Sequence, residues 1–157
     1  MNDCTGARLT GCGGAPTPMQ KYIGTKIVFA EPATKGKCYK GPEMMSSEQA
    51  AEPGYKVVYP DGYESWSPKA AFEQAYRPTD GMTFGLALEA MKVGKKCARP
   101  GWNGKGMYLQ AQFPDEHSKM TFPYLYMTIP DCTEGLRRLP WQPAQVDLFS
   151  DDWMIIY

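Results

Sequence analysis

Apolar residues follow helical spacing in the second half of the chain, between residues 84 and 93. They are Phe84, Ala87, Leu88 and Met91. Positions i, i+3, i+4 and i+7 share one face of a helix, so we expect an amphipathic helix over 84–93. Thr83 stands where a cap is expected, and Gly94 supplies the left-handed conformation at which helices commonly end.

Shorter apolar stretches after this helix predict strands separated by turns. We expect strands at 95–99, 107–112, 124–129 and 153–157, and a short helix at 144–149. Trp153 alternates with Ile155 in the last strand, which is typical of a core position. No internal repeat is visible.

The first half of the chain predicts a smaller set of elements. Strands are expected at 26–30, where Pro32 would end the strand, and at 54–59, which returns through a Pro-Asp-Gly turn to form a hairpin with 63–66. Ser67 is expected to cap a helix over 69–76, with Pro68 as its first residue. Residues 35–53 are rich in Lys, Gly, Ser, Glu and Pro and are read as a long loop.

These elements predict an α+β protein made of small antiparallel sheets with short helices, in two modules packed together. We expect a disordered tail at 1–18, because its glycine- and proline-rich pattern cannot bury a face. A small α+β module of unknown role follows at 19–80, and a second module spans 82–157. Either the tail is a flexible appendage or Met19 is the natural start.

Charge and cysteine content narrow the function classes. Nine basic and nine acidic residues in 1–81, and eight of each in 82–157, leave both halves neutral. Binding of a nucleic-acid polymer relies on a basic surface, so we expect none, whereas a small anionic ligand needs only a few local cations.

Five irregularly spaced cysteines without a Cys-x-x-Cys motif argue against a disulfide framework or a structural zinc site, and favour reduced thiols in a cytosol. The sequence has no apolar run long enough for a membrane span.

The sequence also lacks the common catalytic motifs, and we expect no enzyme, cofactor or metal. Its single histidine, His117, lies in a polar segment and is interpreted as solvated surface. Asp151 and Asp152 are open to two interpretations: an acid/base or metal-binding pair, or an exposed turn, which adjacent acids before a strand favour.

The glycine-rich segment 99–107 is the most informative candidate site. Its glycines allow close backbone approach to a ligand, and Trp102 offers a flat face for a purine. Asn103 can pair with a base edge, while Arg99 and Lys105 suit a pyrophosphate. The alternative is a β-turn whose tryptophan packs into the core, which the residues alone favour.

A second candidate cluster lies at 140–147. Trp141 stands between prolines that stiffen the backbone, Gln145 can read a base edge, and Asp147 can accept hydrogen bonds from ribose hydroxyls. The alternative is that Trp141 fills the core and Asp147 lies on a helix surface.

In this order, after the helix at 84–93, these two clusters resemble a short phage family that includes the second type of Thoeris anti-defence protein. The resemblance rests on 98–105 (ARPGWNGK), Pro140-Trp141, 145–148 (QVDL) and 151–153 (DDW), and covers about 82–157. Residues 141–144 depart from the Trp-Leu-Ala-Ser-like run expected there, and short relatives lack 19–80. That first module resembles other small phage modules containing Ser-Trp-Ser-Pro-Lys.

The resemblance implies a binding protein in the cytoplasm of the infected bacterial host. It implies a homotetramer with pockets between protomers that hold the immune signal glycocyclic ADP-ribose intact; some relatives also hold cyclic dinucleotides at a separate site. The expected ligand contacts are Arg99, Trp102, Asn103, Lys105, Trp141, Gln145 and Asp147. Alternatives are a phage enzyme that processes the nucleotide signal, or a structural or host-interaction protein.

Overall fold

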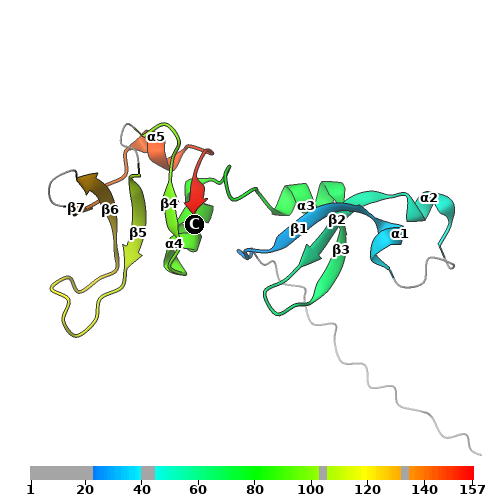
Figure 1. Cartoon of the computed structure of the whole chain (residues 1–157), viewed down its shortest axis with the longest axis horizontal. Coiled ribbons are helices and arrows are strands. Elements are labelled where there is room, and N and C mark those ends of the chain that lie inside the picture. The colour runs from blue at the N-terminus through cyan, green and yellow to red at the C-terminus, as the bar shows by residue number, and fades with distance from the viewer. Residues whose placement is uncertain (1–22, 40–44, 103–105, 132–134) are drawn as a thin grey trace, which may run out of the picture.

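The computed structural model describes residues 23–39, 45–102, 106–131 and 135–157, and within them it forms two antiparallel sheets. Figure 1 shows these sheets toward opposite ends of the described chain, each with its own helices. The expected α+β class, with small antiparallel sheets and short helices, is confirmed. The expected tail at 1–18 lies outside the described residues.

The first sheet has the order β1-β2-β3. Its strands are β1 (Phe29–Thr34), β2 (Pro53–Val58) and β3 (Glu64–Pro68). Helix α3 (Lys69–Ala75) packs on one face, where the ring of Phe72 stacks on Tyr55 with centroids 4.3 Å apart. On the opposite face, Trp66 lies over Gly54 and donates from Nε1 to the carbonyl of Ala33 (3.1 Å).

The structure corrects three expectations for this first sheet. The first strand lies at 29–34 rather than 26–30 and runs through Pro32, because an edge strand does not need the N–H that proline lacks. The expected loop at 35–53 contains the short helices α1 (Lys35–Cys38) and α2 (Ser47–Ala50). Ser67 belongs to β3, and Pro68 takes the cap position of α3 that was expected for the serine.

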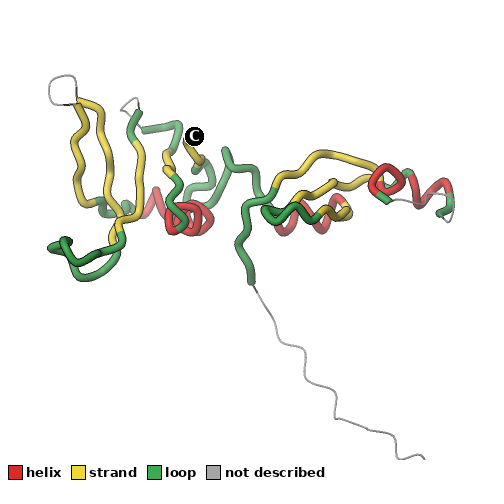
Figure 2. The backbone as a smooth tube through the Cα atoms, turned by 60° about the horizontal axis from the view of Figure 1, so that its bottom comes forward, coloured by secondary structure: helices red, strands yellow, loops and turns green. Residues whose placement is uncertain are grey.

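The second sheet has the order β7-β6-β5-β4-β8. Its strands are β4 (Lys96–Ala98), β5 (Tyr108–Gln112), β6 (Tyr124–Asp131), β7 (Gly135–Pro140) and β8 (Met154–Ile156). Sequence reasoning missed β7, since all six of its residues are exposed and two adjacent arginines obscure any alternation. In Figure 2 the loop between β5 and β6 extends beyond the ends of the strands.

Helix α4 (Phe84–Lys92) covers one face of the second sheet with the apolar stripe that its spacing predicted. Ala87 and Met91 are fully buried. They share one core cluster with Cys97, Leu109 and Trp153. Gly94 ends the helix with φ of +84°, as expected. The core of this module therefore lies between one short helix and strands β4, β5 and β8.

The segment joining the two sheets is tied to the second one. The N–H of Ile155 donates to the carbonyl of Thr79 (2.8 Å), and Met82 pairs with Trp153 through two backbone hydrogen bonds of 2.8 and 3.0 Å. Ile27, which precedes β1, packs against the core of the second module. The joint is thus an extension of the second sheet rather than a free linker.

We expect Leu109→Ala to lower the free energy of unfolding by about 2–5 kcal/mol, because this fully buried leucine lies between α4 and the strands. The matched control is Leu136→Ala on β7, where the leucine is 54% exposed and truncation should cost well under about 1 kcal/mol. Chemical denaturation of the two variants measures both effects, and equal losses would contradict this assignment of the core.

Candidate functional site

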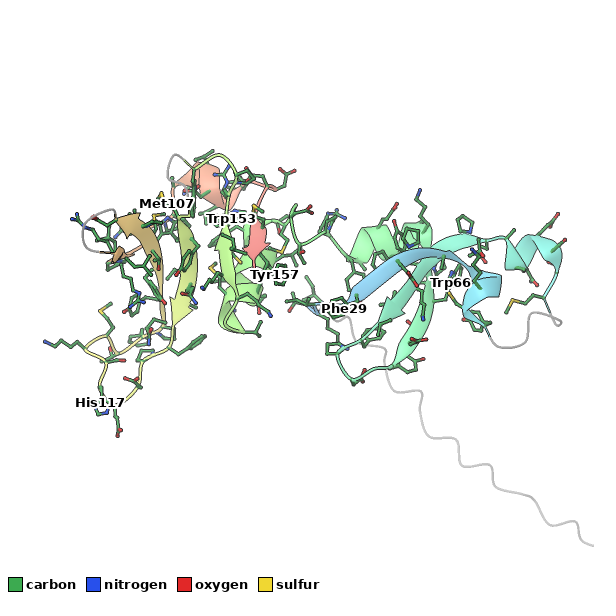
Figure 3. All side chains as sticks on the ribbon, viewed as in Figure 1. Phe29, Trp66, Met107, His117, Trp153 and Tyr157 are labelled. Carbon is green, nitrogen blue, oxygen red and sulfur yellow. The ribbon has the colours of Figure 1, made fainter. Side chains whose placement is uncertain are left out.

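Four aromatic side chains gather where the second module brings its two candidate clusters together. We call them the aromatic cluster: Phe84, Trp102, Trp141 and Trp153. Trp153 is fully buried at its centre, as predicted, and Figure 3 shows it within the second module. Its ring meets Trp102 and Trp141 nearly edge-on, with centroids 5.4 and 6.0 Å apart, which is a favourable aromatic geometry.

Trp102 is partly buried and packs against the core. Its Nε1 points toward Asp147 Oδ1 at 3.4 Å, and its ring lies 6.4 Å from that of Trp141. The structure thus favours the alternative in which Trp102 contributes to core packing. The residue as a whole is nevertheless only partly buried.

Local backbone structure places Trp141 and Asp147 beside this tryptophan. Trp141 follows the last residue of β7 and extends the sheet pairing through its N–H, which donates to the carbonyl of Leu125 (2.9 Å). Helix α5 (Gln145–Leu148) then begins after Ala144, whose N–H donates to Asp147 Oδ2 (3.3 Å). The carboxylate of Asp147 therefore caps its own helix.

Arg99 links these elements through a partly buried network of ion pairs. Its Nη1 donates to Asp147 Oδ1 (2.7 Å), while Nε and Nη2 hold Asp152 Oδ1 and Oδ2 at 2.6 and 3.2 Å. The side chains of Arg99 and Asp147 are only 15% and 13% exposed. We call Arg99, Asp147 and Asp152 the ion cluster. Among described residues it pairs one cation with two carboxylates, so it carries net negative charge.

Within the ion cluster, Arg99 and Asp152 shift each other's pKa so that both favour the charged form. The hydrogen bonds from Arg99 lower the pKa of Asp152, and those to Asp152 and then Asp147 raise the pKa of Arg99. Arg99 and Asp152 therefore both stay charged at neutral pH. The expected phosphate contact of Arg99 would have to form beside two carboxylates that already occupy three of its N–H groups.

The other expected contacts are distributed around these clusters. Gln145 is exposed on α5, two residues from Asp147. Asn103 and Lys105 lie outside the described residues. The structure thus brings together two expected contacts from each candidate cluster. They are Arg99 and Trp102 from the first, and Trp141 and Asp147 from the second. Sequence reasoning considered Asp152 only together with Asp151, as an acid/base or metal-binding pair or as an exposed turn, and did not foresee its contact with Arg99.

A second feature, which sequence reasoning missed, lies on the sheet face turned away from α4. A hollow of about 270 Å³ is lined by Gln112, Tyr124, Tyr126, Arg138, Leu139 and Pro140. Tyr126 donates to Gln110 (3.1 Å) on the neighbouring strand. On the same face, by strand register, Thr128 is fully buried, and its hydroxyl has no hydrogen-bond partner among the described residues. Tyrosines and an arginine here offer stacking and charge to an anionic aromatic ligand.

Residues that could support metal or nucleophilic chemistry are scattered. Within the described ranges, no three His, Cys, Asp or Glu side chains gather to hold a metal ion. His117 is 86% exposed. Figure 3 shows it at the outer tip of the loop between β5 and β6. Burial raises the pKa of the Cys97 thiol to about 11, which keeps it protonated at neutral pH.

Comparison with known proteins identifies the module that contains both clusters. A sequence family described as Tad2-like, the Thoeris anti-defense 2-like domain, matches residues 82–156. Thoeris anti-defense 2 from Bacillus phage SP01 is 32% identical over 84 residues, which cover 94% of that protein and 48% of this chain. The chain belongs to the Thoeris anti-defense 2 family. The family match begins at Met82, so the first sheet and its helices lie outside it.

We expect Trp102→Ala to lower the free energy of unfolding by about 3 kcal/mol, near the lower end of tryptophan truncations, because the ring is only partly buried. Trp102→Phe is the matched variant, because it keeps an aromatic ring against Trp153 and removes the indole N–H that faces Asp147. Its free energy of unfolding should fall much less than that of Trp102→Ala. Thermal and chemical denaturation measure the stability of both variants. A Trp102→Ala protein as stable as wild type would show that the ring contributes nothing to the core.

Proposed function

We propose that this chain is a phage-encoded sponge that binds glycocyclic ADP-ribose and sequesters it without cleavage, which blocks Thoeris-type defence. The observation that carries the proposal is the family match over 82–156, the segment that holds the aromatic and ion clusters. The contacts expected from the sequence for the signal are Arg99, Trp102, Asn103, Lys105, Trp141, Gln145 and Asp147. In the structure, Arg99 and Asp147 already bind each other. Its site of action in this proposal is the cytoplasm of the infected bacterium, where the signal would be captured.

Sequestration requires affinity and abundance but no turnover. A Kd of 1 nM corresponds to about −12 kcal/mol. Stacking of a base on a tryptophan ring contributes about 1–3 kcal/mol, and charge-assisted hydrogen bonds add to it. The exposed histidine and the protonated Cys97 thiol also favour binding over hydrolysis. In the described part of the chain, no helix is both long and apolar enough to cross a bilayer.

We further propose that the hollow on the opposite face of the sheet binds a second class of ligand, cyclic dinucleotides. Tyr124 and Tyr126 would stack against bases there, and Arg138 would contact phosphate. This placement keeps the two ligands on different faces of the same module.

Enzymatic processing of the signal and a purely structural or host-interaction role are the competing functions. We expect the purified protein to deplete glycocyclic ADP-ribose from solution at about one molecule per site and to release it unchanged when heated. Filtration followed by chromatography of the heated supernatant measures both steps. Recovery of a cleaved product would instead establish an enzyme, and a signal that is never depleted would favour an interaction protein.

The proposal also includes a homotetramer with binding pockets between protomers. Several large apolar side chains of the family-matched module are at least half exposed, as expected for surfaces that become covered by other copies. They include Phe113, Met120, Phe122, Leu139, Val146 and Phe149.

Light scattering should therefore give a particle of about four times the 17.5 kDa chain mass. We expect Phe149→Glu to reduce this mass, because Phe149 is 86% exposed and follows α5, next to the candidate site. The matched control, Tyr63→Glu, changes a 64% exposed aromatic of the first module and should keep the assembly intact. A particle of 17.5 kDa at micromolar concentration would exclude the tetramer.

A further inference from the structure

The carboxylate of Asp147 is already used by the protein. Its Oδ1 accepts from Arg99 (2.7 Å) and from Trp102 (3.4 Å), and its Oδ2 accepts from the N–H of Ala144 (3.3 Å). Its backbone carbonyl also accepts from Trp153 Nε1 (2.9 Å). With a side chain only 13% exposed, Asp147 has little capacity left for the hydroxyl groups of a ligand.

Asp152 presents the opposite situation in the same ion cluster. Arg99 holds both of its oxygens, at 2.6 and 3.2 Å, so the orientation of the carboxylate is fixed. The side chain is nevertheless 41% exposed. Each carboxylate oxygen can accept more than one hydrogen bond, so Asp152 keeps acceptor capacity directed to solvent.

We propose that Asp152, and not Asp147, recognises sugar hydroxyl groups of the nucleotide signal, and that Arg99 is the positioning residue that aims it. This inference rests on the proposed function, because it names how the same site selects its ligand. A hydroxyl that donates to an ionised carboxylate forms a charge-assisted hydrogen bond, which is stronger than a neutral one. A phosphate group would be repelled by the same carboxylate, so the sugar of the ligand, rather than its pyrophosphate, lies beside Asp152.

The chain offers a close control for this assignment. Asp151 is the adjacent residue, has the same side chain and is exposed, while the bidentate contact with Arg99 belongs to Asp152. Asp152→Asn keeps the shape of the side chain and one oxygen for Arg99, but it removes the charge and one acceptor. Asp151→Asn makes the same chemical change one residue away.

The test is calorimetric titration of the full chain with glycocyclic ADP-ribose and with analogues that each lack one free ribose hydroxyl. We expect Asp152→Asn to weaken binding of the parent signal about ten- to hundredfold, as for loss of a hydrogen bond to a charged group. Asp151→Asn should stay within about twofold of wild type. For the analogue that lacks the recognised hydroxyl, wild type and Asp152→Asn should bind equally, and melting temperatures should confirm that both variants are folded.

Arg99→Lys tests the positioning role, because a lysine cannot hold a carboxylate through two parallel N–H bonds. It should weaken binding of the parent signal, and the double variant Arg99→Lys/Asp152→Asn should bind no more weakly than Asp152→Asn alone, since both changes remove one interaction. Parent affinity unchanged in Asp152→Asn, or an equal loss on every analogue, would overturn the role of Asp152 while leaving the proposed function intact. A wild-type protein that binds none of these nucleotides would overturn both.

Discussion

The ion cluster centred on Arg99 is the interaction on which the arrangement of the second module depends. Arg99 follows β4, Asp147 lies in α5 and Asp152 precedes β8, so one guanidinium joins segments about fifty residues apart in the chain. Partly buried charges of this kind are costly if one partner is missing. The loop after β4 and the short helix α5 therefore have to meet in one arrangement, which also brings the rings of Trp102 and Trp141 onto Trp153.

The aromatic and ion clusters act together in shaping the surface around them. Trp153 is fully buried, and its indole N–H donates a hydrogen bond to the backbone carbonyl of Asp147. The carboxylate of Asp147 accepts a hydrogen bond from the indole N–H of Trp102. Hydrogen bonds thus connect the aromatic cluster directly to the ion cluster. A site built on such a linked core is held rigidly, which suits a protein whose proposed task is to bind a small ligand tightly without turnover.

The first module has a different physical character. Within its described residues, Val57 is the one buried hydrophobic side chain, and the module is otherwise held by stacked rings and by Trp66 lying over the sheet. Ile27 and the segment around Thr79 anchor it to the second module. The family match begins at Met82, so the clusters that carry the proposed function lie in the second module, while the linking residue Met82 pairs with Trp153 just before β8.

The sequence by itself determined the elements whose signal is local. The apolar stripe of α4, its end at Gly94, the burial of Trp153 and the antiparallel α+β class all follow from spacing and turn residues. The ordered series of motifs from Ala98 to Trp153 also indicated the family. Local signals failed where neighbouring strands decide the outcome, as in the exposed strand β7 and in β1 running through Pro32.

Only the tertiary structure decided which functional groups are already engaged within the protein. The sequence placed Arg99 and Asp147 among ligand contacts because their chemistry suits phosphate and ribose. It could not show that they bind each other across forty-eight residues, or that Arg99 also holds Asp152. Spacing along a chain carries no information about pairs formed by the folding of distant segments. The engagement of Asp147 and the exposure of Asp152 are consequences of that folding, and they separate two aspartates that look alike in the sequence.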